Sequence, residues 1–154
     1  MLYIDIDGVM ADFNKAVLQH TGSEYSGKDT WEILENIPNL FYNLEVLPDA
    51  YYALNFIERN FIPYEFLTAL PLPTKELYSA HIDKVRWVQR KLHSDAQVNC
   101  VSHRSQKKYF VQNGKHDILV DDMLDNCLEW QEAGGIAIYH RNWRASIEEL
   151  QKYL

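Results

Sequence analysis

Residues 1–13 read MLYIDIDGVMADF, and two carboxylates, Asp5 and Asp7, lie where a short apolar strand ends. Residues 2–6 are rich in β-formers, so we expect a buried strand there, and Gly8 breaks it. Aspartate is disfavoured inside strands and costs free energy when it is buried without a partner. The position of both carboxylates at the end of a buried strand therefore indicates a functional site.

The composition limits the class of protein. With 154 residues, of which 47% are hydrophobic, the chain is long enough for one globular domain with its own core. A formal charge of −7 argues against binding a polynucleotide, because such binding uses basic surfaces. The chain has neither a signal peptide nor an apolar run of about 18 residues, so we expect a cytoplasmic protein with no membrane contact. Whether it forms a homodimer is left open.

Short apolar runs alternate with amphipathic segments along the chain. The expected strands cover residues 2–6, 64–68, 96–102, 116–122 and 136–140. The expected helices cover residues 49–60, 75–93, 123–133 and about 144–153. Strands that are apolar throughout and alternate with helices indicate a parallel sheet covered on both faces. The sequence therefore predicts an α/β, three-layer, Rossmann-like fold.

One segment does not follow this alternation. Residues 14–48 are polar and aromatic by turns, are interrupted by glycine and proline, and contain no convincing strand. We therefore expect a small helical unit inserted into a core that comprises residues 1–13 and 49–154.

Polar residues gather at the carboxyl ends of the expected strands, where open parallel sheets bind ligands. Asp5 and Asp7 follow the first strand, Thr68 ends the second, and Asp121 and Asp122 end the fourth. Carboxylates brought together repel one another unless a cation intervenes, and oxygen ligands suit Mg²⁺. The pattern predicts a Mg²⁺ site, and a metal with spare carboxylates is suited to phosphoryl transfer.

Several motifs carry a resemblance to a known family. DIDGVMADF (5–13), FLT (66–68) and a lysine ahead of DILVDD (117–122) resemble the haloacid dehalogenase superfamily of aspartate-dependent phosphatases. FYNLEVLPDA (41–50) and LVDDMLDNCLEWQEAGGIAIYH (119–140) are similar to segments of its 5′-deoxyribonucleotidase group. The likeness covers nearly the whole chain.

The resemblance implies roles for individual residues. Asp5 would attack phosphorus and form an aspartyl-phosphate, and Asp7 would protonate the leaving oxygen and then deprotonate water. Thr68 would donate a hydrogen bond to a phosphoryl oxygen. For the lysine that neutralises this oxygen we prefer Lys108, because Lys-Tyr-Phe-Val matches the family better, and Lys107 is the alternative.

The resemblance also implies a ligand set for Mg²⁺. The carboxylates of Asp5 and Asp121 and the backbone carbonyl of Asp7 would hold the ion. Asp122 would orient the site from outside, or bind the metal directly if the register is shifted by one residue. Members of the superfamily that dehalogenate lack an aspartate at the position of Asp7, so its presence favours phosphate esters.

In the resembled group, a cap lies over the phosphate site and aromatic rings hold the base. Residues 14–48 fall where that cap is inserted, and stacking on a ring is worth roughly 1–3 kcal/mol per base. Trp31 and Tyr42 are looser aromatic candidates, and packing within the cap explains them better than contact with a base. The residues assigned to substrate binding are Phe13, Phe41, Ala69, Arg104 and Lys107.

The leading hypothesis is Mg²⁺-dependent hydrolysis of 5′-(deoxy)nucleoside monophosphates to nucleoside and phosphate. One alternative is a phosphatase for another small ester, either a sugar phosphate or a nucleic-acid end. Another is an inactive relative that binds a nucleotide or a protein partner. The sequence does not choose the base or the sugar.

The proposed roles place a condition on the backbone. Side chains alternate between the two faces of a regular strand. A strand that continued through Gly8 would therefore fix the directions of both the Asp5 and the Asp7 carboxylates. Both must reach one substrate in different roles, so we expect the chain to leave strand geometry by Asp7, with Gly8 permitting the turn.

Overall fold

A five-stranded parallel sheet forms the centre of the computed structural model, which describes residues 1–154. The strands are β1 (Leu2–Ile4), β2 (Tyr64–Ala69), β3 (Val98–Val101), β4 (Ile118–Asp121) and β5 (Ile136–Tyr139). Their order, β3-β2-β1-β4-β5, places β1 between β2 and β4 and makes a switch point between β1 and β4. The predicted α/β, Rossmann-like parallel sheet is confirmed.

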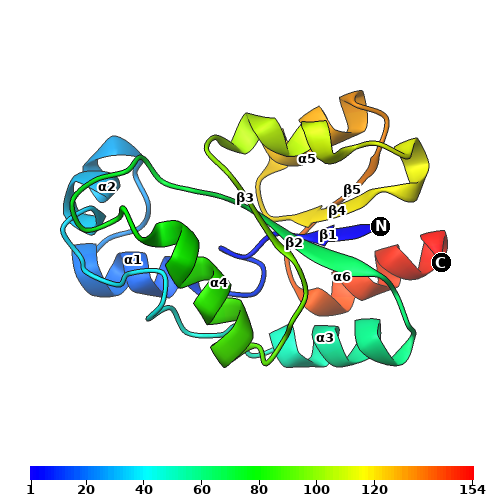
Figure 1. Cartoon of the computed structure of the whole chain (residues 1–154), viewed down its shortest axis with the longest axis horizontal. Coiled ribbons are helices and arrows are strands. Elements are labelled where there is room, and N and C mark those ends of the chain that lie inside the picture. The colour runs from blue at the N-terminus through cyan, green and yellow to red at the C-terminus, as the bar shows by residue number, and fades with distance from the viewer.

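Helices cover both faces of the sheet and complete the three layers (Figure 1). On one side lie α3 (Ala50–Arg59) and α6 (Trp143–Leu150), and α4 (Ala80–Lys91) packs against β3. On the other side lies α5 (Leu124–Glu132), which packs against β4 and β5. None of the helices combines the length and the apolar run that crossing a bilayer would need.

Three short 3₁₀ helices complete the regular structure. They are η1 (Arg104–Phe110), η2 (Gly114–His116) and η3 (Gln151–Tyr153). The first of them packs against α5 and against the ends of β2 and β3. It therefore brings its side chains close to the carboxyl edge of the sheet.

Two helices, α1 (Phe13–Thr21) and α2 (Lys28–Leu34), lie together at one end of the molecule, away from α5 and α6 (Figure 1). The side chain of Asp12 accepts a hydrogen bond from the Lys15 amide and caps the start of α1. The segment is helical and contains no regular strand, as expected for residues 14–48. Its division from the core as a separate cap stays a prediction.

Buried tryptophans fix the loops around the carboxyl edge. The indole nitrogen of Trp87 donates to the Leu44 carbonyl at 2.8 Å, and that of Trp143 donates to the Val9 carbonyl at 2.9 Å. Both side chains are fully buried, so each indole N–H has the partner that burial requires. Trp143 thereby anchors the turn that follows Asp7.

The element boundaries differ from the predicted ones in one instructive place. The helix expected over residues 75–93 begins at Ala80 and ends at Lys91, and residues 75–79 form turns instead. On this helix the side chain of Ile82 is 54% exposed, whereas that of Lys84 is buried.

Candidate active site

The loop after β1 positions both of its aspartates. The strand ends at Ile4, and the Ile6 carbonyl accepts hydrogen bonds at 2.9 Å from amides four and five residues later. Gly8 has a φ of +81°, in the left-handed region that favours glycine. Asp5 and Asp7 line the same cavity. The expectation that the chain leaves strand geometry by Asp7 is confirmed.

Gly8 is required for space as well as for its backbone angle. A Cβ at this position would lie 2.0 Å from Oδ2 of Asp122, well inside contact distance. The loop after β1 therefore packs directly against the end of β4, and only glycine permits this approach.

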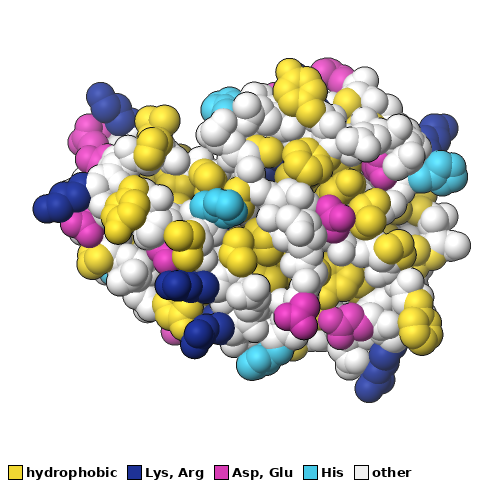
Figure 2. Space-filling model, in the orientation of Figure 1, with side chains coloured by type: hydrophobic (Ala, Val, Ile, Leu, Met, Phe, Trp, Pro, Cys, Tyr) yellow, Lys and Arg dark blue, Asp and Glu magenta, His cyan; other side chains and the backbone are white.

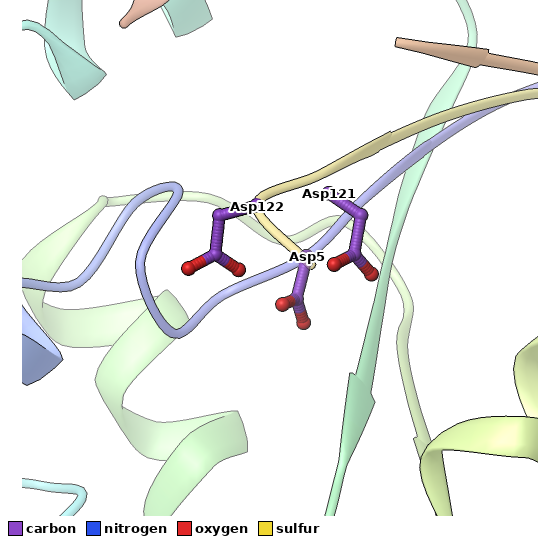
Figure 3. Close-up of side chains that lie close together, drawn as sticks. All are labelled: Asp5, Asp121 and Asp122. Carbon is purple, nitrogen blue, oxygen red and sulfur yellow. The ribbon is translucent and has the colours of Figure 1, made fainter. Parts of the chain in front are cut away.

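Three carboxylates meet at the carboxyl ends of β1 and β4. One oxygen from each of Asp5, Asp121 and Asp122 lies within 4.8 Å of the others, and the three side chains point to the same side (Figure 3). Asp5 is 6% exposed and Asp121 is fully buried. Burial, together with the neighbouring carboxylates of Asp5 and Asp121, raises the pKa of Asp122 to about 8. The three carboxyl groups therefore favour the binding of a cation at this site.

One buried lysine supplies part of that charge. The Nζ of Lys107 lies 2.9 Å from Oδ1 of Asp5 and 2.7 Å from Oδ2 of Asp121. Burial alone would lower the pKa of Lys107, but these two carboxylates outweigh it and the pKa is raised. A single ammonium thus faces three carboxylates, and its position holds Asp5 in place.

The structure places Lys107 beside Asp5, and the preferred Lys108 lies away from it. The side chain of Lys108 is half-buried, and its Nζ lies 5.7 Å from the centre of the Tyr109 ring. Both lysines belong to η1, and a 3₁₀ helix has three residues per turn, so neighbouring side chains point in very different directions. Only Lys107 faces the sheet, and a short motif does not reveal which of two adjacent lysines does so.

Asp121 and Asp122 differ in what their oxygens contact. Asp121 accepts hydrogen bonds from Lys107, from the Met123 amide and from the side-chain amide of Asn126. No protein donor contacts the carboxylate of Asp122 within hydrogen-bond distance. The carboxylate of Asp121 is therefore engaged by protein donors and that of Asp122 is not, and which of the two binds a cation stays a prediction. Asn126 was not anticipated.

A second buried lysine was also missed. The Nζ of Lys84, on α4, lies 2.6 Å from Oδ2 of Asp7, 2.8 Å from Oγ1 of Thr68 and 2.8 Å from the Ala69 carbonyl. The sequence pattern alone predicts an ordinary amphipathic helix in this segment. One signal was available, because Lys84 lies four residues before the buried Val88 and so shares its apolar face.

The site opens into a cavity of about 300 Å³, between the α1–α2 end and the edge of the sheet. In the space-filling view the outline is notched between these two parts (Figure 2). The cavity is lined by Asp5, Asp7, Phe13, Asn14, Tyr25, Trp31, Phe41, Thr68, Ala69, Leu70, Pro71, Arg104, Lys107, Asp122, Met123 and Asn126.

Aromatic rings form one wall of this cavity. The ring centre of Phe13 lies 5.9 Å from that of Trp31 and 6.5 Å from that of Tyr25. Phe41 also lines the cavity but is only 2% exposed, so little of its ring is open to a ligand. Tyr42 does not line it and lies in another cavity instead.

Arg104 lines the same cavity, but its guanidinium is engaged by α5. Its nitrogens lie 3.3 Å from Oδ1 of Asn126, 3.3 Å from Oε1 of Glu129 and 3.5 Å from Oδ2 of Asp125. These acidic partners neutralise much of the charge that a phosphate would need. Substrate binding by Arg104 stays a prediction.

No model of a known protein family matches the chain, and no curated protein sequence does. Solved structures do. A HAD-superfamily hydrolase from Ehrlichia chaffeensis has a TM-score of 0.59 and 10% identity, and the match covers 99% of this chain and 96% of that one. A HAD family hydrolase from Deinococcus radiodurans R1, with bound phosphate and sodium, has a TM-score of 0.55 and 11% identity over 95% and 86%.

D,D-heptose 1,7-bisphosphate phosphatase from Burkholderia thailandensis is similar over 97% of both chains, with a TM-score of 0.51 and 11% identity. At these identities the likeness concerns the fold. The resemblance to haloacid dehalogenase proteins, stated above from the sequence motifs, is confirmed at this level. The assignment to the deoxyribonucleotidase group stays a prediction.

Replacing Lys107 by methionine should destabilise the protein strongly, because it leaves buried carboxylates without their partner. We expect a loss of about 3–5 kcal/mol in the free energy of unfolding at pH 8, measured by denaturant titration without divalent metal. The matched control is Lys108→Met, which removes the neighbouring charge and should change stability little. Equal losses in the two variants would contradict the geometry.

The raised pKa of Asp122 predicts a pH dependence of stability. An aspartate is ordinarily ionised above about pH 4, whereas the folded chain resists ionising Asp122 until about pH 8. The unfolded state therefore loses this proton first, and the metal-free protein should lose stability as the pH rises from about 4 to about 8. Asp122→Asn should reduce this loss and stabilise the protein at pH 8 by about 1–3 kcal/mol. Parallel unfolding curves for the two proteins across this range would refute the prediction.

Proposed function

We propose that this chain, which has the fold of the haloacid dehalogenase hydrolases, is a phosphomonoesterase for 5′-(deoxy)nucleoside monophosphates. The observation that carries the proposal is one cavity lined by Asp5, Asp7, Thr68, Lys107 and an aromatic wall. A buried carboxylate beside a lysine, with a second carboxylate two residues on, provides a nucleophile and an acid–base group together.

The donor set fits a divalent cation. The carboxylates of Asp5 and Asp122 and the backbone carbonyl of Asp7 would hold Mg²⁺, since hard cations take oxygen ligands. The close approach of Gly8 to Asp122 supports this set, because it brings the loop after β1 beside the free carboxylate. When bound, the ion would supply positive charge to the phosphate and to the carboxylates.

The residues of the chain then divide the reaction between them. A carboxylate oxygen of Asp5 attacks phosphorus, and the phosphorus–oxygen bond to the leaving group breaks as Asp7 gives that oxygen a proton. Water next attacks phosphorus, Asp7 takes the proton from the water, and phosphate leaves Asp5. Thr68 donates a hydrogen bond to a phosphoryl oxygen, and the ammonium of Lys107 neutralises its charge.

Burial raises the pKa of Asp7, and the adjacent Lys84 offsets this only in part. A carboxyl group with a raised pKa holds its proton closer to neutral pH, as a general acid must. It then takes a proton back readily when it acts as a base. The environment of Asp7 is therefore suited to both half-reactions.

The aromatic wall supports a nucleotide rather than a bare phosphate. Phe13, Tyr25 and Trp31 stand on the α1–α2 side of the cavity, opposite the carboxylates. A base stacked there would keep its 5′-phosphate within the acidic site. The volume of about 300 Å³ lies at the small end of the usual range for ligand pockets.

A panel of esters tests the proposed function. Phosphate release is measured from 5′- and 3′-monophosphates, deoxy and ribo, and from sugar phosphates, with and without Mg²⁺. We expect Mg²⁺-dependent release from 5′-nucleotides, reduced by about 10³-fold or more in Asp5→Asn. Release confined to sugar phosphates would support phosphomonoester hydrolysis but contradict the nucleotide as substrate. No release from any ester would overturn both.

The aromatic wall makes a separate prediction. Phe13→Ala and Trp31→Ala should each raise KM for a 5′-nucleotide by roughly 10-fold, which corresponds to 1–3 kcal/mol of stacking. The KM for deoxyribose 5-phosphate, which has no base, should hardly change. Tyr42→Ala is the matched control, because that ring lies outside the cavity. Equal changes in KM for the two substrates would show that the wall does not hold the base.

A further inference from the structure

Lys84 is a buried cation whose donors are all in use. Its side chain is 1% exposed, and Nζ contacts Oδ2 of Asp7, Oγ1 of Thr68 and the carbonyl of Ala69 at 2.6–2.8 Å. An ammonium group has three N–H donors and no acceptor, so these contacts use every donor. Lys84 does not line the cavity, and it has no donor left for a substrate. Its effect must pass through its partners.

Phe41 closes the remaining side of this ammonium. The ring centre lies 4.6 Å from Nζ of Lys84, a distance suited to a cation–π contact. Because Phe41 is itself buried, water has no route to the ammonium from this side. The lysine is therefore held in one position.

The contact with Thr68 fixes the direction of a hydroxyl group. Lys84 can only donate, so Oγ1 of Thr68 accepts, and the hydrogen of that hydroxyl must point elsewhere. No protein acceptor takes this hydrogen, and Thr68 lines the cavity. Its O–H is left available to a ligand in the cavity.

The contact with Asp7 distinguishes its two oxygens. Oδ2 is held by Lys84, whereas Oδ1 is buried and has no hydrogen-bond partner. A buried carboxylate oxygen without a partner costs free energy, so its retention needs a reason. Oδ2 is therefore the one carboxylate oxygen of Asp7 that the protein holds, and the direction of the carboxyl group depends on Lys84.

We propose that Lys84 is a positioning residue that holds the carboxyl group of Asp7 and the hydroxyl group of Thr68 in the orientations in which they act on the substrate. The inference rests on the proposed function. As the Asp5–phosphorus bond forms and the ester bond breaks, the proton passes from the Asp7 carboxyl group to the leaving oxygen. Asp7 later takes a proton from the attacking water, which restores the starting state.

Lys84→Met tests this role through the leaving group. From a deoxynucleoside 5′-monophosphate the leaving group is the 5′-alkoxide of the nucleoside, which needs a proton, whereas the p-nitrophenolate that leaves from p-nitrophenyl phosphate hardly does. We expect kcat to fall by about 10²-fold on the nucleotide, because proton transfer by a positioned group contributes 10²–10⁴-fold. The loss on the aryl ester should be at least several-fold smaller. Lys91→Met, at the half-buried last position of the same helix, is the control and should leave both rates unchanged.

The outcomes separate this inference from the function on which it rests. If the wild-type protein hydrolyses neither ester, the proposed function is wrong. If the wild-type protein hydrolyses both and Lys84→Met loses both equally or loses neither, only the positioning role is overturned. Should Lys84→Met not fold, Lys84→Gln, which keeps N–H donors, is measured in the same way. If neither variant folds, Lys84 is a structural residue and the inference is overturned.

Discussion

The structure depends on an excess of buried negative charge at the carboxyl ends of β1 and β4. Asp5 and Asp121 share one ammonium, that of Lys107, whereas Asp122 beside them has no protein cation, and the three groups repel one another when they are ionised. This excess gives the site its affinity for positive charge. It also makes the surrounding hydrogen bonds necessary, because an unpaired buried charge would destabilise the fold.

The sheet topology explains why these groups meet. The order β3-β2-β1-β4-β5 puts β1 in the centre, so the end of β2 with Thr68 and the end of β4 flank Asp5 on either side. Lys84 then connects Thr68 with Asp7, across the loop that follows β1. The strand order therefore determines which side chains meet at the switch point.

Much of the fold and part of the site could be predicted from the sequence. Apolar strands give a strong local signal, and a carboxylate at a strand end is conspicuous, so the parallel sheet and the gathering of Asp5, Asp7 and Thr68 were accessible. The distinction of Lys107 from Lys108 was not, because it depends on the register of a 3₁₀ helix. Lys84 was missed for a related reason: a lysine on a helix resembles a solvated residue until the partners brought by tertiary packing are known.

If Asp5 is the nucleophile, its phosphorylated form can be trapped and identified. The Asp7→Asn variant is mixed with p-nitrophenyl phosphate and Mg²⁺, quenched in acid and digested, and the peptides are weighed by mass spectrometry. The aryl ester forms the intermediate without an acid, and the loss of Asp7 slows its hydrolysis. We expect a phosphate group on the peptide that contains Asp5. Turnover of the ester with phosphate on no peptide, or on a peptide without Asp5, would contradict it.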